Sequence, residues 1–270
     1  MFPIKLDDEM VVVHIDDGKG EDREVHVPDA RANKPMGFHD QQDGQTMFVQ
    51  RLIDANINES KLSIAAPNEI ALSLNISKRS VEKSNELRAL LKKQGEKEKS
   101  KLFEKEVAIA YDYLEEIQKA IVFSYKAVES FCNATIPDDY VYKRTTNKGI
   151  EEHYRKEQIE RWVNTSEKVS SILPEILEVD APSQQTFWSD FKNLERIRNE
   201  IIHSKSGNST EILKELFSSK VRTYILSSVD LLHFFIKSDP FNVIFPLGFG
   251  ESRVKVLSVE NVDELFKKAD

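Results

Sequence analysis

Three side chains near residue 200 have the types and the spacing that chemistry on a phosphodiester requires. Arg198 and Asn199 are adjacent, and His203 follows four residues after Asn199. Residues four apart are neighbours on a helix surface, so these side chains could line one edge of a cleft. An arginine stabilises charge on a phosphate, and a histidine moves a proton near neutral pH. We therefore interpret Arg198, Asn199 and His203 as candidate catalytic residues.

The position of Arg198 within its helix is unusual. On a helical wheel it falls in the middle of an apolar stripe formed by Phe187, Phe191, Leu194 and Ile201. A buried, unpaired guanidinium is costly. Either Arg198 points into a cleft and binds an anion, or it is a structural residue. In the structural case it reaches solvent or pairs with a carboxylate such as Glu129 or Glu195.

The elements that must position these residues are predicted to be helices. An apolar stripe with spacings of three and four predicts a long helix from about 103 to a point before Pro137. A second stripe covers 159–176, with a kink or a restart of the helix at Pro174, and the third helix carries Arg198 and ends near 206–208. A fourth helix begins near Ser209 and ends at Asp239. The fold class is therefore mainly α, an up-and-down bundle of four core helices.

The chain divides into three predicted regions. Residues 1–79 form an acidic, mixed region in which 10–15 and 24–27 are expected to pair as short strands and 28–46 to be loop. Residues 80–238 form the helical bundle. Residues 239–270 form a tail whose apolar pieces are expected to pack on the bundle, with strand pairing as the alternative.

Composition narrows the class of protein. The net charge of −8 comes mostly from residues 1–60, which hold 6 Lys+Arg and 13 Asp+Glu. One cysteine excludes an intramolecular disulfide, and the six histidines lack the spacing of a metal site, so we predict no metal and no cofactor. With no apolar run of membrane length and no signal peptide at the N-terminus, we expect a cytoplasmic protein without a membrane partner.

Two segments of the chain resemble a known family. Residues 194–203, LERIRNEIIH, resemble the signature of the HEPN superfamily (higher eukaryotes and prokaryotes nucleotide-binding), in which an arginine and a polar residue precede a histidine. Residues 124–133, SYKAVESFCN, continuing to Pro137, resemble the first bundle helix of HEPN proteins from prokaryotic defence and toxin systems. The resemblance covers about half of the chain.

The resemblance implies a metal-independent endoribonuclease that cleaves RNA through its 2′-hydroxyl, in a homodimer that brings two Arg/His pairs together. Arg198 would hold the phosphate, His203 would act as base or acid, and Asn199 would orient one of them. A regulatory or antitoxin protein is a possible partner. Lys205 stands where some HEPN toxins carry a modified tyrosine, which argues against that form of control. Lys192, Arg196 and Lys205 are candidate RNA-binding residues.

Two other interpretations stay open. The chain could be a non-catalytic HEPN-like module that binds a nucleotide or a protein. It could also be an unrelated helical adaptor in which Arg198 forms a structural ion pair. Catalysis requires Arg198 and His203 to face a common, partly open cleft near a dimer axis. The adaptor requires Arg198 within reach of a carboxylate and His203 in solvent elsewhere.

Overall fold

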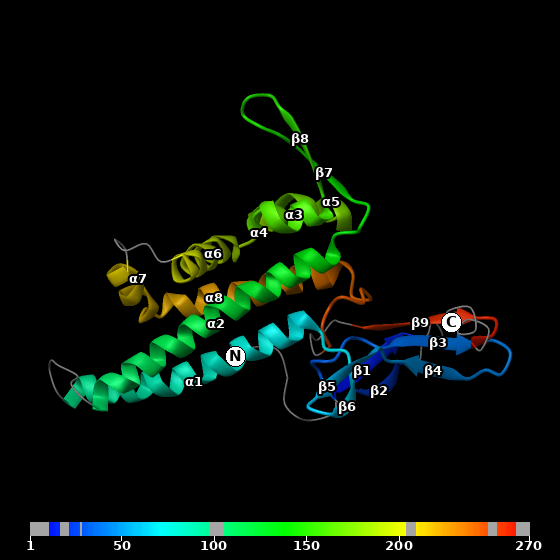
Figure 1. The fold of residues 1–270 in the computed structure, drawn as a ribbon, viewed down its shortest axis with the longest axis horizontal. Helices are drawn as coiled ribbons and strands as arrows, with labels where there is room; N and C mark the ends of the chain where they lie inside the picture. The colour runs from blue at the N-terminus through cyan, green and yellow to red at the C-terminus, as the bar shows by residue number, and fades with distance from the viewer. Residues whose placement is uncertain are drawn as a thin grey trace. The chain divides into compact units, whose positions relative to one another are not determined.

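The computed structural model describes residues 11–16, 22–27, 29–97, 105–203, 209–247 and 253–262. These residues are mainly α-helical, with a few small sheets (Figure 1). The chain separates into two compact units. One contains residues up to Leu72 and from Ile236 on, and the other contains Ser73–Phe235.

The first unit is built around a five-stranded sheet in the order β2-β1-β9-β3-β4. The strands are β1 (Val11–Asp16), β2 (Asp22–Val27), β3 (Met36–Asp40), β4 (Thr46–Val49) and β9 (Val254–Val259). β1 and β2 pair antiparallel, which confirms the predicted N-terminal hairpin, although most of the turn between them lies outside the described residues. β3 falls within 28–46, where the sequence predicted only loop.

The C-terminal segment differs from the prediction that it packs on the bundle. β9 lies at the centre of the sheet, parallel to both β1 and β3, so the strand-pairing alternative holds for these residues. Gly37 on β3 is needed for this contact, since a Cβ there would lie 2.9 Å from Val256 and 3.0 Å from Phe48. Leu247, Val254 and Ala32 form the buried cluster beside it.

A buried lysine holds the same C-terminal segment in place. The Lys34 ammonium donates to the carbonyl oxygens of Pro240 (3.1 Å), Asn242 (2.9 Å) and Arg253 (3.0 Å). Burial lowers the pKa of Lys34 to about 8, partly opposed by the charge of Asp239. The unit also carries an antiparallel hairpin of β5 (Leu52–Ile57) and β6 (Ser60–Ala65).

The second unit contains the long helices. α1 (Glu69–Lys97) begins well before residue 80, where the helical bundle was predicted to start, because Asn68 caps it by accepting the Ala71 amide at 2.9 Å. α2 (Lys105–Thr135) ends before Pro137, as predicted. α6 (Trp188–Ile202) carries the candidate catalytic residues, and its last helical residue precedes the predicted end.

Two predicted helices are broken into shorter pieces. The second stripe folds as α3 (Lys156–Trp162), α4 (Thr165–Glu167), a π-helical turn at Lys168–Ile172 and α5 (Leu173–Leu177). Pro174 lies in the first turn of α5, so the predicted restart holds. A short 3-10 turn, Pro182–Gln184, follows. The fourth helix is α7 (Ser209–Leu216) followed by α8 (Lys220–Ser238). Between α2 and α3 the chain forms an antiparallel hairpin of β7 (Val141–Thr145) and β8 (Glu151–Arg155).

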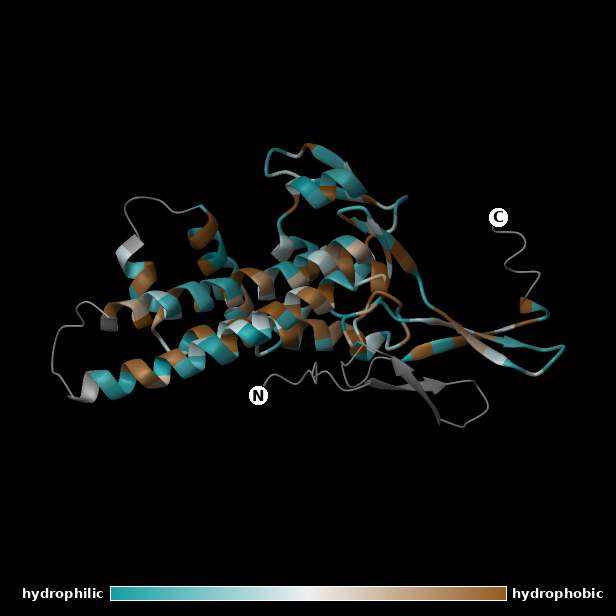
Figure 2. Ribbon diagram, turned by 60° about the horizontal axis from the view of Figure 1, so that its bottom comes forward, coloured by the Kyte–Doolittle hydropathy of each residue, from teal (hydrophilic) through white to brown (hydrophobic). Residues whose placement is uncertain are grey.

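The core of this unit is formed where the apolar stripes of α2, α6 and α8 meet. Phe131 and Phe235 lie with ring centroids 5.5 Å apart, and the Tyr113 hydroxyl donates to the Leu216 carbonyl at 2.7 Å. Cys132 is fully buried. Figure 2 shows hydrophobic and hydrophilic residues alternating along the long helices, as in amphipathic helices. No helix in the described part of the chain is long and apolar enough to cross a membrane.

Candidate active site on helix α6

Arg198 lies on the partly buried side of α6, with 24% of its side chain exposed. Phe191 and Leu194 of the apolar stripe are buried against the rest of the unit, and so is Ile197, which precedes Arg198 in the chain. A guanidinium at this position has its stem packed in the bundle and its charged end within reach of solvent. This is an intermediate case between the cleft and the structural interpretations.

Three contacts fix the guanidinium of Arg198. It donates to the Asn199 side-chain oxygen at 3.0 Å, and its Nη2 lies 3.7 Å from Oε2 of Glu129 on α2. Its Cζ lies 4.9 Å from the ring centroid of Tyr125, also on α2, which is a cation–π distance. The Glu129 contact is too long for a strong hydrogen bond, so the Arg198 cation is oriented without being fully neutralised.

Behind Tyr125 lies a buried polar network centred on Glu195. The carboxylate of Glu195 accepts hydrogen bonds from the Tyr125 hydroxyl (2.9 Å), the Ser166 amide (3.3 Å) and hydroxyl, and the Lys192 ammonium (2.6 Å). Burial acts to raise the pKa of Glu195, but the hydrogen bonds from Lys192, Ser166 and Tyr125 outweigh it and lower that pKa. Burial and the Glu195 charge raise the pKa of Tyr125 well above its usual range. Tyr125 therefore stays a neutral donor, anchored to Glu195 and facing Arg198.

His203 lies at the C-terminal end of α6 and is exposed, as is Asn199. Its amide donates to the Asn199 carbonyl at 2.8 Å, and its φ of −117° and ψ of 47° end the helix. Among the residues that the structure describes, none hydrogen-bonds the His203 imidazole. Five residues along a helix correspond to about 7.5 Å of rise and about 140° of rotation. Within one chain, Arg198 and His203 therefore occupy the same end of α6 but different faces.

The candidate RNA-binding residues have intramolecular partners where the structure describes them. Lys192 donates to Glu195 and, at 2.7 Å, to Ser166. Arg196 pairs with Glu215 on α7. Both cations are partly exposed, and each carries a carboxylate at its side. Lys205 lies outside the described residues.

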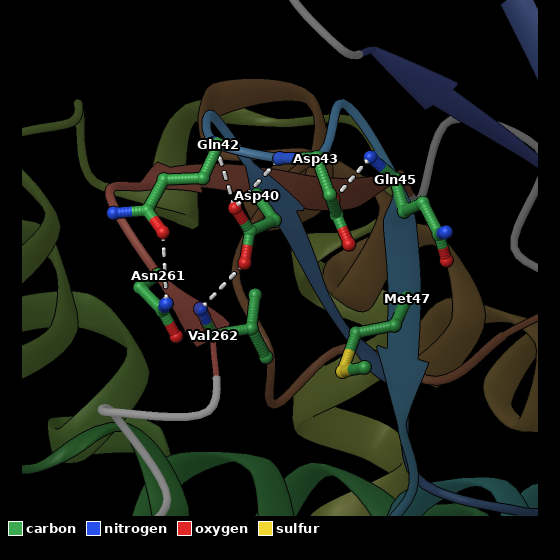
Figure 3. A pocket seen from close by; sticks show the side chains of 7 residues that line it. All are labelled: Asp40, Gln42, Asp43, Gln45, Met47, Asn261 and Val262. Atoms are coloured by element: carbon green, nitrogen blue, oxygen red, sulfur yellow. Dashed lines mark hydrogen bonds between the residues drawn. The ribbon is translucent and has the colours of Figure 1, made fainter.

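A small pocket lies in the first unit and contains none of the predicted site residues. It has a volume of about 150 Å³ and lies between the β3–β4 turn and the end of β9 (Figure 3). The Asp40 carboxylate accepts the amides of Val262 and Gln42, each at 2.8 Å, and of Asp43 at 3.4 Å. Those hydrogen bonds, Val262 first, lower the pKa of Asp40. The polar groups here tie the turn to the end of β9.

Sequence reasoning named Glu129 and Glu195 as possible partners of Arg198, and Glu129 is the one within ion-pair distance. It missed Tyr125, which contacts both Arg198 and Glu195. One feature of the sequence could have indicated the buried polar network: Ser166 is a polar residue inside an apolar stripe, and a buried hydroxyl requires a polar partner. No group of metal-ligating side chains is found among the described residues.

Comparison of this chain with family models, with curated proteins and with solved structures gives no match.

Proposed function

We propose that the protein is a metal-independent endoribonuclease of the HEPN type, in which Ser73–Phe235 is a HEPN-like four-helix bundle and α6 carries the active site. We further propose that it acts as a cytoplasmic homodimer in a prokaryotic defence or toxin system. A regulatory or antitoxin protein would be its partner. The proposal rests on the sequence signature, and the geometry of α6 is compatible with it.

The observation that carries the proposal is the state of Arg198. An arginine in an apolar stripe lowers the stability of the fold unless its charge is paired or reaches solvent. Arg198 is partly exposed, and it is oriented by Tyr125, by Asn199 and by Glu129 at 3.7 Å. Preorganised cations of this kind stabilise the charge that develops on a phosphate in the transition state. An exposed imidazole at the end of the same helix supplies the proton-transfer group.

The reaction follows from these two groups. His203 takes the proton from a ribose 2′-hydroxyl, and the 2′-oxygen attacks the adjacent phosphorus. Arg198 stabilises the additional negative charge on the phosphate oxygens, while Asn199 keeps the guanidinium aligned. The bond to the 5′-oxygen breaks, and that oxygen takes up the proton that His203 had removed, directly or through water. The products are a 2′,3′-cyclic phosphate and a 5′-hydroxyl. Since Arg198 and His203 lie on different faces of α6, a site combining both is most simply formed by two copies of the helix.

One observation favours a second candidate function, that of a helical adaptor unrelated to the HEPN superfamily. Glu129 lies 3.7 Å from Arg198, which meets the distance criterion for a structural ion pair. In that case Arg198 would stabilise the fold, and His203 would be an ordinary surface residue. The two candidates differ in what the loss of each side chain does to activity and to stability.

Cleavage of a mixed-sequence single-stranded RNA by the purified protein in EDTA tests the proposal. We expect cleavage that ends in cyclic phosphate, reduced at least 100-fold by Arg198→Ala and by His203→Ala. Arg222→Ala, an exposed arginine on α8, is the matched control and should cleave normally. If the wild-type protein leaves the RNA intact while Arg198→Ala lowers the free energy of unfolding, the helical adaptor replaces the ribonuclease.

A further inference from the structure

A buried lysine lies beside the candidate site and takes no part in the reaction derived above. Lys168 begins the π-helical turn Lys168–Ile172, a kind of turn that is frequent at functional sites, and only 1% of this residue is exposed. Its ammonium donates to the Asn133 side-chain oxygen on α2 at 2.9 Å and to the Glu160 carbonyl at 3.1 Å. Both acceptors are neutral groups. Among the residues that the structure describes, no carboxylate lies within ion-pair distance of this ammonium.

The charge of Lys168 is not needed for these two hydrogen bonds. A neutral donor would make them without the cost of burying an ammonium, so the charge itself requires an explanation. Burial lowers the pKa of Lys168, and the negative charges of Glu129 and Glu160 oppose this effect. The neighbouring Cys132 thiol contributes no charge at neutral pH, because burial raises its pKa to about 12. Glu129 is thus a carboxylate that helps to keep the buried ammonium charged.

The same Glu129 is the carboxylate that faces Arg198. On α2, Tyr125, Glu129 and Asn133 follow one another at spacings of four, so they form one row on the surface of the helix. Arg198 contacts the first two residues of this row, and Lys168 contacts the third. Glu129 therefore stands between a partly exposed guanidinium and a buried ammonium. Within the described part of the chain, its carboxylate accepts no hydrogen bond.

The charges of this row leave an excess of one positive charge. Two cations, Arg198 and Lys168, share the single carboxylate of Glu129, which gives a balance of +1. The nearby Glu195 does not change this balance, because Lys192 pairs with it at 2.6 Å. A carboxylate attracted by a second cation neutralises the first one less, which agrees with the long distance of 3.7 Å between Glu129 and Arg198.

We propose that Lys168 is a positioning residue of the candidate site, which shares the charge of Glu129 and so keeps the guanidinium of Arg198 available to a phosphate of RNA. The inference rests on the proposed function, because it takes an RNA phosphate as the anion that Arg198 binds. Lys168 is buried and does not touch the RNA. Without its charge, Glu129 would pair more closely with Arg198 and compete with the phosphate.

Binding is measured by fluorescence anisotropy with a labelled 2′-O-methyl RNA oligonucleotide, which cannot be cleaved through a 2′-hydroxyl. Lys168→Met should weaken binding about fivefold, the upper value for one partly exposed ion pair. Glu129→Gln removes the competing carboxylate without altering the buried lysine, and it should strengthen binding by about three- to fivefold. Glu116→Gln is the matched control. Glu116 also pairs with a cation on α2, Lys119 at 2.7 Å, but it lies about 20 Å along the helix from Glu129, so affinity should stay within about twofold.

The double variant Glu129→Gln/Lys168→Met separates positioning from a structural role. If Lys168 acts through Glu129, its loss has no effect once the carboxylate is gone, and the double variant should bind within about twofold of Glu129→Gln alone. A lysine that only ties α2 to the π-helical turn would cost the same affinity in both backgrounds. Single-turnover cleavage of unmodified RNA should show the same recovery, and urea unfolding verifies that each variant is folded under the assay conditions.

The inference is overturned if Lys168→Met weakens binding equally with and without Glu129, if Glu129→Gln binds no better than Glu116→Gln, or if the wild-type protein does not bind the oligonucleotide. Cleavage of unmodified RNA together with equal losses in both backgrounds removes the role of Lys168 and leaves the ribonuclease. Recovery of binding in the double variant without any cleavage removes the ribonuclease and leaves the role of Lys168.

Discussion

Substitutions of Tyr125 should separate its contribution to stability from its contribution to the orientation of Arg198. Its hydroxyl donates a hydrogen bond to Glu195, and its ring makes a cation–π contact with the guanidinium of Arg198. Tyr125→Phe removes one donor from a buried carboxylate that keeps its bonds from Ser166 and Lys192. A hydrogen bond to a charged group is worth about 1.5–3 kcal/mol, so the free energy of unfolding should fall by about that amount. The phenyl ring still lies beneath Arg198, so RNA cleavage by the folded protein should stay within about threefold of wild type.

Tyr125→Leu removes the ring as well. The loss of the cation–π contact and of packing against Phe191, whose ring centroid lies 6.1 Å from that of Tyr125, should cost a further 1–3 kcal/mol or so. Arg198 would then lose its lateral support, and cleavage should fall at least about tenfold. Urea unfolding and single-turnover cleavage below the unfolding transition measure the two effects. Equal cleavage by the Phe and Leu variants would refute the positioning role of the ring.

Two further predictions concern the first unit. Burial lowers the pKa of Lys34 to about 8 in the folded protein, whereas in the unfolded chain this pKa is about 10.5. Between pH 8 and pH 10.5, unfolding therefore takes up a proton. Below pH 8 the folded protein bears the full cost of burying the charged ammonium. The free energy of unfolding should therefore rise by up to about 3 kcal/mol between pH 8 and pH 10.5, relative to Lys34→Met followed in parallel urea titrations; parallel pH curves would contradict this. Gly37→Ala should destabilise the unit by about 1–3 kcal/mol, because the added Cβ would lie 2.9 Å from Val256. Gly44→Ala is the control: nothing lies within 4 Å of its Cβ, but the positive φ of 72° should cost about 1 kcal/mol. An unchanged midpoint of urea unfolding in Gly37→Ala would mean that β9 does not pack against Gly37.

The helices were predictable where their apolar stripes are continuous and a breaker ends them. Pro137 fixes the end of α2, and the stripe through Phe191 and Leu194 locates α6. Where the prediction failed, tertiary contacts or short polar signals decide the structure. The start of α1 depends on Asn68 as a cap, and the break between α7 and α8 falls at 217–219, which no proline or glycine marks.

The sheet was less predictable, because its central strand comes from the far end of the chain. In the sequence, β9 is only a short apolar segment of the C-terminal tail. Its position in the sheet is determined by its pairing with β1 and β3, which are far from it along the chain. The same limit applies to the candidate site. The charges of Arg198 and Glu129 were enough to suggest them as a pair. The contacts from Glu195 through Tyr125 to Arg198 join α6 to α2, and no pattern of spacing within either helix indicates them.

The position of β9 has a consequence for synthesis on the ribosome. The first unit is discontinuous, and the helical unit, Ser73–Phe235, is an insertion between its two parts. Translation proceeds at roughly 5–20 residues per second, so roughly 10–40 s separate the emergence of β3 from that of β9. During this interval β1 and β3 lack the strand that joins them. All helices between Ser73 and Phe235 are synthesised before β9 and can fold without it. The helical unit is thus the first that can mature, and the sheet is completed last.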